Sequence, residues 1–233
     1  MSNTKDSIGS LFDRIAHSYD PLNHLFSLNI DKLWRKKTVR SMRSHDNVLD
    51  VAIGTADLSI EMIRQRKAGR IEGIDLSREM MAIGEKKVSK KLKDLSGLVR
   101  FTYANAQDMP FDDNSFDAVT CAFGIRNFAD LDKGLGEMYR VMKPGGELRI
   151  LEFSYPSNRF IRWLYDIYFS RIMPFVGRLF SRDRTAYTYL NRSVKSFIWG
   201  EDMKNKLTGI GFTNVGYKEL TFGIATLYSA VKQ

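Results

Sequence analysis

The stretch "NVLDVAIGTADLSI", residues 47–60, decides the fold of this chain of 233 residues. A short apolar run over residues 47–53 leads into the small residues Gly54, Thr55 and Ala56, and a helical pattern follows. This order is typical of a buried strand that turns directly into a helix in a parallel α/β sheet. Because ligands bind beyond the carboxyl ends of such strands, the glycine turn marks a candidate site.

The rest of the chain repeats this alternation of apolar runs and amphipathic stretches. After the fifth run, "GFTNVGYKEL" and "TFGIATLYSAVK" (211–232) are typical of a closing antiparallel pair, and "MKPGGE" (142–147) predicts a turn because proline and paired glycine cannot continue a helix. The sequence therefore predicts a mostly parallel α/β sheet with an antiparallel end. The first five strands are expected at "NVLDVAI" (47–53), "RIEGID" (70–75), "VRFTYA" (99–104), "FDAVTCAF" (116–123) and "GELRILEF" (146–153).

Composition narrows the class of protein. With 43% apolar residues, the chain can bury a substantial core, and we expect a single domain over residues 1–233. There is no apolar signal-peptide core or membrane span, so a cytoplasmic protein is expected. Cys121 is the one cysteine and is interpreted as a core residue; without clustered cysteine or histidine ligands, no metal site is expected.

The formal net charge of +9 favours an anionic partner, which charge alone does not identify. A nucleic-acid-binding or RNA-modifying protein is one alternative, but the chain contains no recognised RNA-binding module, so no nucleic-acid partner is expected. Solvated helix faces also account for the basic stretches "KLWRKKTVRSMR" (32–43) and "EKKVSKKLKD" (85–94).

Three successive strand ends offer groups for one ligand. Asp50 precedes the turn at Gly54 and Thr55, Asp75 ends the second strand, and Asn105 with Ala106 follows the third. An acid at the second strand end can accept hydrogen bonds from both ribose hydroxyls, and Asn105 with the Ala106 backbone can meet an adenine edge.

The first loop argues against a dinucleotide. Its glycine spacing is not G-x-G-x-x-G and its acids would repel a pyrophosphate, which disfavours an NAD(P)-dependent oxidoreductase. A cofactor with a cationic amino-acid end fits better, because Asp50 can face an ammonium, and S-adenosylmethionine is such a molecule. The competing structural roles are helix N-caps for Asp57 and Asp75 and a turn for Asn105.

The chain resembles the class I S-adenosylmethionine-dependent methyltransferases, and within them the menaquinone/ubiquinone biosynthesis C-methyltransferase family. The resemblance implies a doubly wound, seven-stranded, Rossmann-like sheet, with a helical insertion before the last two strands. It also implies methylation of a polyprenylated quinol, with demethylmenaquinol preferred and a ubiquinone-pathway benzoquinol as the alternative. The stretches that carry it are "FDRIAHSYDPLNHLFSLNIDKLW" (12–34), "AFGIRNFADLDKGLGEMYRVMKPGG" (122–146), "LEFSYP" (151–156) and "YTYLNRSVKSF" (187–197).

Two positions depart from the pattern of this family. Gly54-Thr55-Ala56 stands where Gly-Thr-Gly is usual, and Asp31 stands where a histidine is usual. Alanine is small enough to keep the cofactor assignment, and no role is assigned to Asp31.

Arg126 and Asn127 follow the fourth strand and are expected to face the methyl acceptor. Arg126 would stabilise a developing phenolate and Asn127 would orient it, while Tyr19 or Asp20 would complete the pocket or relay a proton. A salt bridge from Arg126 to Asp130 or Asp132 is the competing structural role.

Helical segments are expected on the substrate side of the sheet, at residues 1–45 and in a lid insertion at 156–197. The aromatic, arginine-rich stretch 156–184 would cover the isoprenoid tail and contact the inner face of the cytoplasmic membrane as a peripheral surface, with Pro174 as an interruption. An ordinary core helix or a homodimer contact is the competing interpretation.

Overall fold

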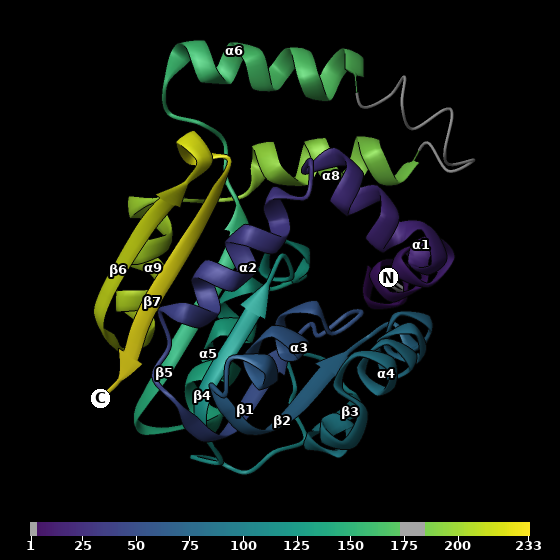
Figure 1. Cartoon of the computed structure of the whole chain (residues 1–233). Helices are drawn as coiled ribbons and strands as arrows, with labels where there is room; N and C mark the ends of the chain where they lie inside the picture. The colour runs from purple at the N-terminus through teal and green to yellow at the C-terminus, as the bar shows by residue number, and fades with distance from the viewer. Residues whose placement is uncertain (1–3, 173–184) are drawn as a thin grey trace.

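The computed structural model describes residues 4–172 and 185–233, which are built around a seven-stranded sheet of order β3-β2-β1-β4-β5-β7-β6 (Figure 1). Strands β1 to β5 are parallel, whereas β7 is antiparallel to both β5 and β6. The predicted doubly wound, mostly parallel sheet with an antiparallel end is therefore confirmed. The strands are β1 His45–Val51, β2 Ala68–Asp75, β3 Val99–Tyr103, β4 Phe116–Ala122, β5 Met142–Phe153, β6 Phe212–Leu220 and β7 Ala225–Lys232.

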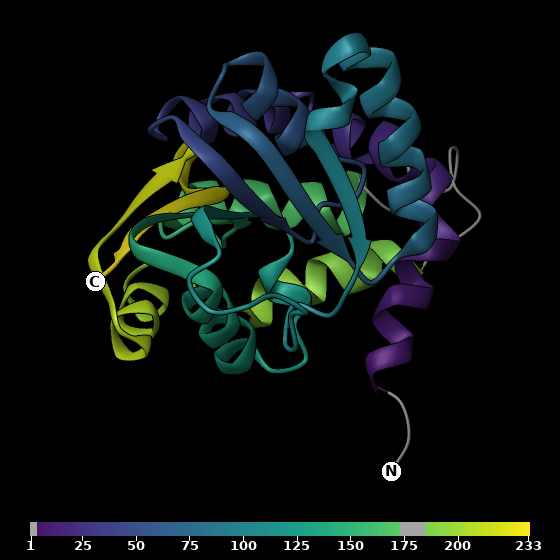
Figure 2. The same cartoon turned by 90° about the horizontal axis from the view of Figure 1, so that it is seen from below.

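Helices cover both faces of the sheet, as the view from below shows (Figure 2). Helices α2, α3 and α4 lie on one face and α5 and α9 on the other, while α1, α6 and α8 gather beyond the carboxyl ends of the parallel strands (Figure 1). The helices are α1 Thr4–Phe26, α2 Ile30–Arg40, α3 Asp57–Arg64, α4 Arg78–Leu92, α5 Leu131–Val141, α6 Arg159–Ile167, α8 Thr185–Ser196 and α9 Glu201–Ile210, with short turns η1 Lys93–Leu98, η2 Ile125–Asn127, η3 Tyr168–Ile172 and η4 Thr221–Gly223.

The core is divided by the sheet into two layers, because each parallel strand is covered on both faces. One layer packs Leu135 and Met138 of α5 and Leu207 of α9 against the sheet, and the other packs Ile60 of α3 and Val88 of α4. Cys121 lies in the first layer and is fully buried, which confirms that it is a core residue. The two layers fix β1 and β4 side by side, where the strand order reverses and ligands of such sheets bind.

The structure corrects one turn. Residues 142–147 were predicted to form a turn before the fifth strand, but β5 already begins at Met142, where α5 ends. Met142 pairs with Phe116 and Glu147 with Ala118, so residues 143–146 form an irregularity within the strand. Pro144 has no N–H for the ladder and Gly145 has φ +74°, and both features suit a bulge as well as a turn.

The predicted helical insertion contains α6, η3 and α8. Pro174, the expected interruption, lies outside the described residues. Within the described ranges, no helix combines the length and apolar character that crossing a membrane would require.

Candidate active site

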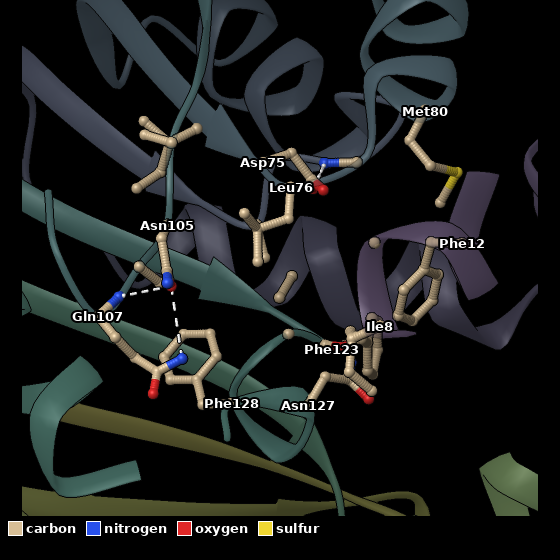
Figure 3. Close-up of a pocket in the computed structure, with 18 of the residues that line it drawn as sticks. Ile8, Phe12, Asp75, Leu76, Met80, Asn105, Gln107, Phe123, Asn127 and Phe128 are labelled. Atoms are coloured by element: carbon tan, nitrogen blue, oxygen red, sulfur yellow. Dashed lines mark hydrogen bonds between the residues drawn. The ribbon is translucent and has the colours of Figure 1, made fainter. Parts of the chain in front are cut away.

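A pocket that is open to solvent lies at the carboxyl ends of β1, β2, β3 and β4 (Figure 3). The empty space within it, including the part that is continuous with solvent, is about 680 Å³. Strand-end loops supply its polar groups, and α1 covers it with apolar side chains. The residues that line it include Gly54, Asp75, Leu76, Asn105, Ala106, Gln107, Asn127 and Phe128 from the strand ends and the loops after them, Met80 from α4, and Ile8, Phe12 and Tyr19 from α1.

Asp75 ties the first two strand-end loops together. Its Oδ2 accepts a hydrogen bond from the Gly54 backbone N–H at 2.8 Å, and its Oδ1 accepts one from Ser77 N–H at 2.9 Å. Burial raises the pKa of Asp75, although these backbone donors oppose the rise. The N-cap of α4 is Ser77, whose hydroxyl accepts from Met80 N–H, so Asp75 does not cap that helix. A carboxylate held in this way on a pocket wall suits a diol such as a ribose.

The third loop contributes an amide, which lies beside apolar side chains of the neighbouring loops. Asn105 and Ala106 both line the pocket, and Asn105 Oδ1 accepts from the Gln107 backbone N–H at 3.0 Å. Asn105 therefore forms the turn that was its competing role and also faces the pocket. Leu76 and Phe128 lie near Asn105 in Figure 3, and such apolar neighbours suit the faces of a purine ring.

Asp50 and Thr55 do not line this pocket, unlike the other residues expected to bind the cofactor. The Asp50 carboxylate accepts hydrogen bonds from Ser59 at 2.6 Å and Thr120 at 2.8 Å, inside the sheet. Burial raises the pKa of Asp50 to about 6, with both hydroxyls opposing the rise. The Thr55 hydroxyl donates to Asp20 Oδ1 at 2.6 Å and accepts from Lys87 Nζ at 2.9 Å, so it anchors α1.

Helix α1 is fastened over the pocket by polar contacts along its length. Asp13 Oδ1 accepts from the Ser77 hydroxyl at 2.6 Å and from Glu79 N–H at 3.2 Å, at the start of α4. Further along α1, Asp20 contacts Thr55 and pairs with Lys87, so it points away from the pocket that it was expected to complete. These contacts place Tyr19 in the pocket wall.

Lys87 also pairs with Asp57, at 2.9 Å. Asp57 was a candidate N-cap of α3, but the N-cap is Ala56, which adopts φ +64°. The left-handed region favours glycine, so the alanine of the Gly-Thr-Ala loop is accommodated with some backbone strain.

Arg126 is buried in an ion pair with Glu152 at the end of β5. Its guanidinium donates to Glu152 Oε1 at 2.7 Å, and its backbone N–H donates to Oε2 at 3.2 Å. Burial disfavours the charge of Arg126, but Glu152, Tyr19 and Tyr189 together outweigh that effect and raise its pKa, so the side chain is a permanent cation. The partners proposed from sequence are wrong: Asp130 caps α5 and Asp132 pairs with Lys206.

The charge of Arg126 acts on the hydroxyls of three tyrosines. Burial raises the pKa of Tyr19, Tyr165 and Tyr189, and the charge of Arg126 opposes the rise in each case. Tyr189 donates to Asn127 Oδ1 at 2.8 Å, and the Asn127 NH₂ group donates to the Phe123 carbonyl at 3.4 Å, which leaves its second N–H as a donor to a ligand. The site thus combines a fixed cation, an oriented amide and hydroxyls that remain protonated, a set suited to stabilising an oxyanion.

Sequence reasoning gave no role to Glu152 or Tyr189, although both lie in stretches that carry the family resemblance. An acid inside the apolar run of the fifth strand was the available signal for Glu152, because a buried carboxylate requires a partner. Tyr189 offered no comparable signal. Asp31, which was assigned no role, is buried between Ser27, Arg35 and His24, and Arg35 and Ser27 lower its pKa against the effect of burial.

Comparison with known proteins gives consistent matches over nearly the whole chain. A family model described as the ubiE/COQ5 methyltransferase family matches residues 1–232. The chain is 43% identical over 229 residues to a demethylmenaquinone methyltransferase of Bacteroides fragilis, covering 97% of this chain and 93% of that one. It is 43% identical over 230 residues to a ubiquinone/menaquinone biosynthesis C-methyltransferase UbiE of Geotalea daltonii, covering 97% of each.

Solved structures match the fold at lower sequence identity. A SAM-dependent methyltransferase of Thermotoga maritima superimposes with a TM-score of 0.69 at 17% identity, over 97% of this chain and 100% of that one. This similarity extends over the sheet and its surrounding helices and identifies the architecture.

Proposed function

Because the chain belongs to the ubiE/COQ5 methyltransferase family, we propose that it methylates a ring carbon of demethylmenaquinol to give menaquinol. It is an S-adenosylmethionine-dependent C-methyltransferase of quinone biosynthesis. The observation that carries the specific reaction is the buried ion pair of Arg126 with Glu152. Arg126 does not itself line the pocket, but it lies in sequence between Gly124 and Asn127, which do. A fixed cation there is what a phenolate requires.

The residues that line the pocket fit the cofactor. Asp75 would accept the ribose hydroxyls, Asn105 and Ala106 would meet the adenine, and Gly54 would allow its loop to approach the ligand closely. Asp50 would act on the amino-acid end through its charge alone, because its oxygens are engaged by the fully buried hydroxyls of Ser59 and Thr120. S-adenosylmethionine supplies an electrophilic methyl group when bound.

On the acceptor side, the chain stabilises charge. A hydroquinone hydroxyl resembles that of tyrosine, with a pKa of about 10, so its anion is scarce at neutral pH. Arg126 would stabilise the phenolate and Asn127 would orient it, with Tyr19 on the pocket wall between α1 and these groups. Arg126 does not act as the base, since a guanidinium is not deprotonated in proteins. In the overall reaction the sulfur–methyl bond breaks, a carbon–carbon bond forms and the ring carbon releases a proton.

Complementation tests this reaction. In a bacterial strain that lacks its own quinone C-methyltransferase, the chain should restore menaquinone, and Arg126→Ala should restore little, as loss of an oxyanion donor costs roughly a hundredfold in turnover. Failure of the wild-type chain to methylate demethylmenaquinone, despite soluble expression, would contradict the proposal. Restoration of ubiquinone alone would identify the benzoquinol alternative.

The isoprenoid tail of the substrate requires an apolar surface outside the pocket that binds the cofactor. Helix α6 exposes Phe160, Trp163 and Leu164 with exposed fractions of 64%, 58% and 43%, and the rings of Phe160 and Trp163 stack at 6.0 Å. Arg159 is exposed on the same helix. Aromatic side chains beside arginine suit the boundary between lipid headgroups and acyl chains. This outer face of α6 would thus rest on the cytoplasmic side of the membrane while the quinol ring enters the site.

Vesicle sedimentation tests the membrane contact. Phe160→Ser with Trp163→Ser should abolish binding to anionic vesicles, whereas Leu95→Ser, at an exposed leucine near the opposite end of the strands, should not. Equal binding by both variants would rule out this face. If the α6 variant instead converts a dimer into a monomer, the face is a homodimer contact.

A further inference from the structure

Two exposed apolar side chains lie on backbone that disfavours them. Leu28, in the turn between α1 and α2, has φ +50° and an exposed fraction of 70%, and Phe222, in η4, has φ +59° and an exposed fraction of 74%. The left-handed region suits glycine and asparagine, and a bulky residue there is an outlier. Because both side chains face solvent, burial in the core does not compensate this strain. The combination indicates a contact with something outside the chain.

Helix α2 and η4 contact each other directly. Trp34 Nε1 donates a hydrogen bond to Thr221 Oγ1 at 2.8 Å. Leu33, with an exposed fraction of 64%, precedes Trp34, and Phe222 follows Thr221, so both apolar side chains are exposed beside this hydrogen bond. We call Leu28, Leu33 and Phe222 the apolar rim.

The apolar rim lies at the end of the sheet that carries the pocket. The Trp34 ring is 6.2 Å from that of Phe123, which lines the pocket, and 6.1 Å from that of Phe153, the last residue of β5. A Cβ added at Gly223 would lie 3.5 Å from Pro156 Cα, so η4 also packs against the segment that leads into α6. The connection between β6 and β7 and helix α6 accordingly lie at the same end of the molecule (Figure 1).

Cations flank the apolar rim on α2. Lys36, Lys37 and Arg40 are exposed, and none of them forms an ion pair within the described part of the chain. The one acid of α2, Asp31, is buried. Lys36 and Lys37 follow Leu33 by about one helical turn, about 5–6 Å along the axis, which is less than the Debye length of about 8 Å at physiological salt. A surface that receives the apolar rim is therefore within reach of these charges.

We propose that the apolar rim inserts into the headgroup region of an anionic lipid bilayer while the cations of α2 bind the lipid phosphates. Apolar side chains beside lysines are the composition that partitions to such a surface. Lysine is depleted from protein–protein interfaces, and nucleic acids bind basic residues mainly through phosphates, which gives exposed leucine and phenylalanine no role.

This contact deepens the proposed function and rests on it only for its purpose. A polyprenylated quinol is dissolved in the bilayer, and the apolar rim would hold the pocket close to it. The residues involved are separate from the exposed residues of α6, so the two surfaces can be tested independently.

Asparagine substitution tests the apolar rim without disturbing the fold. Leu28→Asn with Phe222→Asn removes both apolar side chains and places there a residue that tolerates the left-handed region, so the variant should unfold at the same urea concentration as wild type or higher. Its affinity for vesicles of phosphatidylglycerol and phosphatidylcholine, measured by sedimentation, should fall about 10- to 100-fold, because two apolar side chains no longer leave water. Unchanged affinity would overturn the proposal. If this variant does not fold, Leu33→Ser makes the same test.

A second pair of variants tests the charges. Lys36→Gln with Lys37→Gln should weaken binding to these anionic vesicles about 10-fold, and binding to vesicles of phosphatidylcholine alone much less. The matched control is Lys86→Gln with Lys90→Gln, at exposed positions of α4, which removes the same charge and should bind like wild type. Equal losses in the two pairs would show that net charge rather than α2 attracts the lipid, and would overturn the assignment to α2.

Two substrates separate this proposal from the methylation itself. Under reducing conditions, Leu28→Asn with Phe222→Asn should methylate tail-free 1,4-naphthoquinol in solution at the wild-type rate and demethylmenaquinol in vesicles more slowly. Vesicle binding that depends on the apolar rim in a protein that methylates neither quinol would support the rim and contradict the proposed reaction. Methylation with vesicle binding that does not depend on the rim would do the reverse. A dimer that dissociates in this variant, with vesicle binding unchanged, would assign the rim to a second copy of the chain and overturn the lipid contact.

Discussion

Asp75 is held by Gly54 and Ser77 N–H groups on a pocket wall, which makes it the carboxylate best placed for a ribose. Asp75→Asn should weaken S-adenosylmethionine binding by about 1.5–3 kcal/mol, because an amide cannot accept from two hydroxyls with both of its terminal atoms. Calorimetry measures the loss. Asp46→Asn, at an exposed site near the amino end of β1, is the control and should bind normally. Unchanged affinity in Asp75→Asn would exclude the ribose contact.

The raised pKa of Asp50 predicts how the free energy of unfolding depends on pH. Burial raises its pKa to about 6, above the value of about 3.9 expected for the unfolded chain. The folded chain therefore holds this proton more tightly, so the stabilising contribution is complete below pH 4 and is lost as the pH rises through 6. Asp50→Asn, which keeps partners for Ser59 and Thr120, should remove up to about 3 kcal/mol of that pH dependence.

Urea denaturation between pH 4 and pH 8 provides the measurement for Asp50. The difference in unfolding free energy between Asp50→Asn and wild type should shift in favour of the variant as the pH rises from 4 through about 6, and stay level above that. A difference that is constant with pH would show that Asp50 has an ordinary pKa in the folded chain.

Individual site residues were predictable where the strand-end rule applies. Gly54, Asp75, Asn105 and Asn127 could be placed at one pocket from sequence, because parallel strands bring their carboxyl ends to one edge. The contacts of buried charges could not be predicted. Arg126 forms its ion pair with Glu152 on β5 rather than with the nearby acids of its own segment. This ion pair depends on β4 and β5 being neighbours in the sheet, which the strand order determines.

Helix α1 forms one wall of the pocket through Ile8, Phe12 and Tyr19, and we expect its movement to assist ligand exchange. Asp13 fastens it to the start of α4, where it accepts from Ser77 and Glu79. Asp13→Ala should therefore speed release of S-adenosylhomocysteine by about tenfold, the effect expected for a lost hydrogen bond to a charged group. Stopped-flow displacement gives this rate.

The control for Asp13 lies one residue further along α1. Arg14 is exposed, and Arg14→Ala should release the product at the wild-type rate. Equal rates in Asp13→Ala and wild type would show that α1 does not limit exchange.

The presence and order of the strands could be predicted from the sequence more accurately than the residues at which helices and strands begin and end. The first four strands begin within two residues of their predicted starts, because apolar runs between turn residues determine them. The errors lie at Ala56, which takes the N-cap position expected of Asp57, and at residues 143–146, which form a strand irregularity rather than a turn. In both places the outcome depends on the backbone conformation. Alanine and glycine can each adopt more than one conformation there, so the sequence does not determine which one occurs.

At the scale of the whole molecule, the site has two sides, one for the cofactor and one for the methyl acceptor. Loops of β1, β2 and β3 form the side suited to a nucleoside. On the other side, η2 carries Arg126 and Asn127, which contact Glu152 of β5 and Tyr189 of α8 respectively. The match to one family over residues 1–232 agrees with this arrangement, which uses segments from both termini. A quinol ring between the two sides would place its electron-rich carbon against the methyl group.

Whether methylation occurs should depend on the redox state of the substrate ring. The methyl group leaves sulfur as an electrophile, so the carbon that receives it must be electron-rich, and an oxidised quinone ring is electron-poor. The measurement uses purified protein, S-adenosylmethionine and demethylmenaquinone, with and without dithionite, and follows the methylated product by mass. We predict rapid methylation under reducing conditions and almost none under oxidising conditions. Comparable methylation of the oxidised quinone would contradict both the quinol as substrate and the phenolate-stabilising role of Arg126.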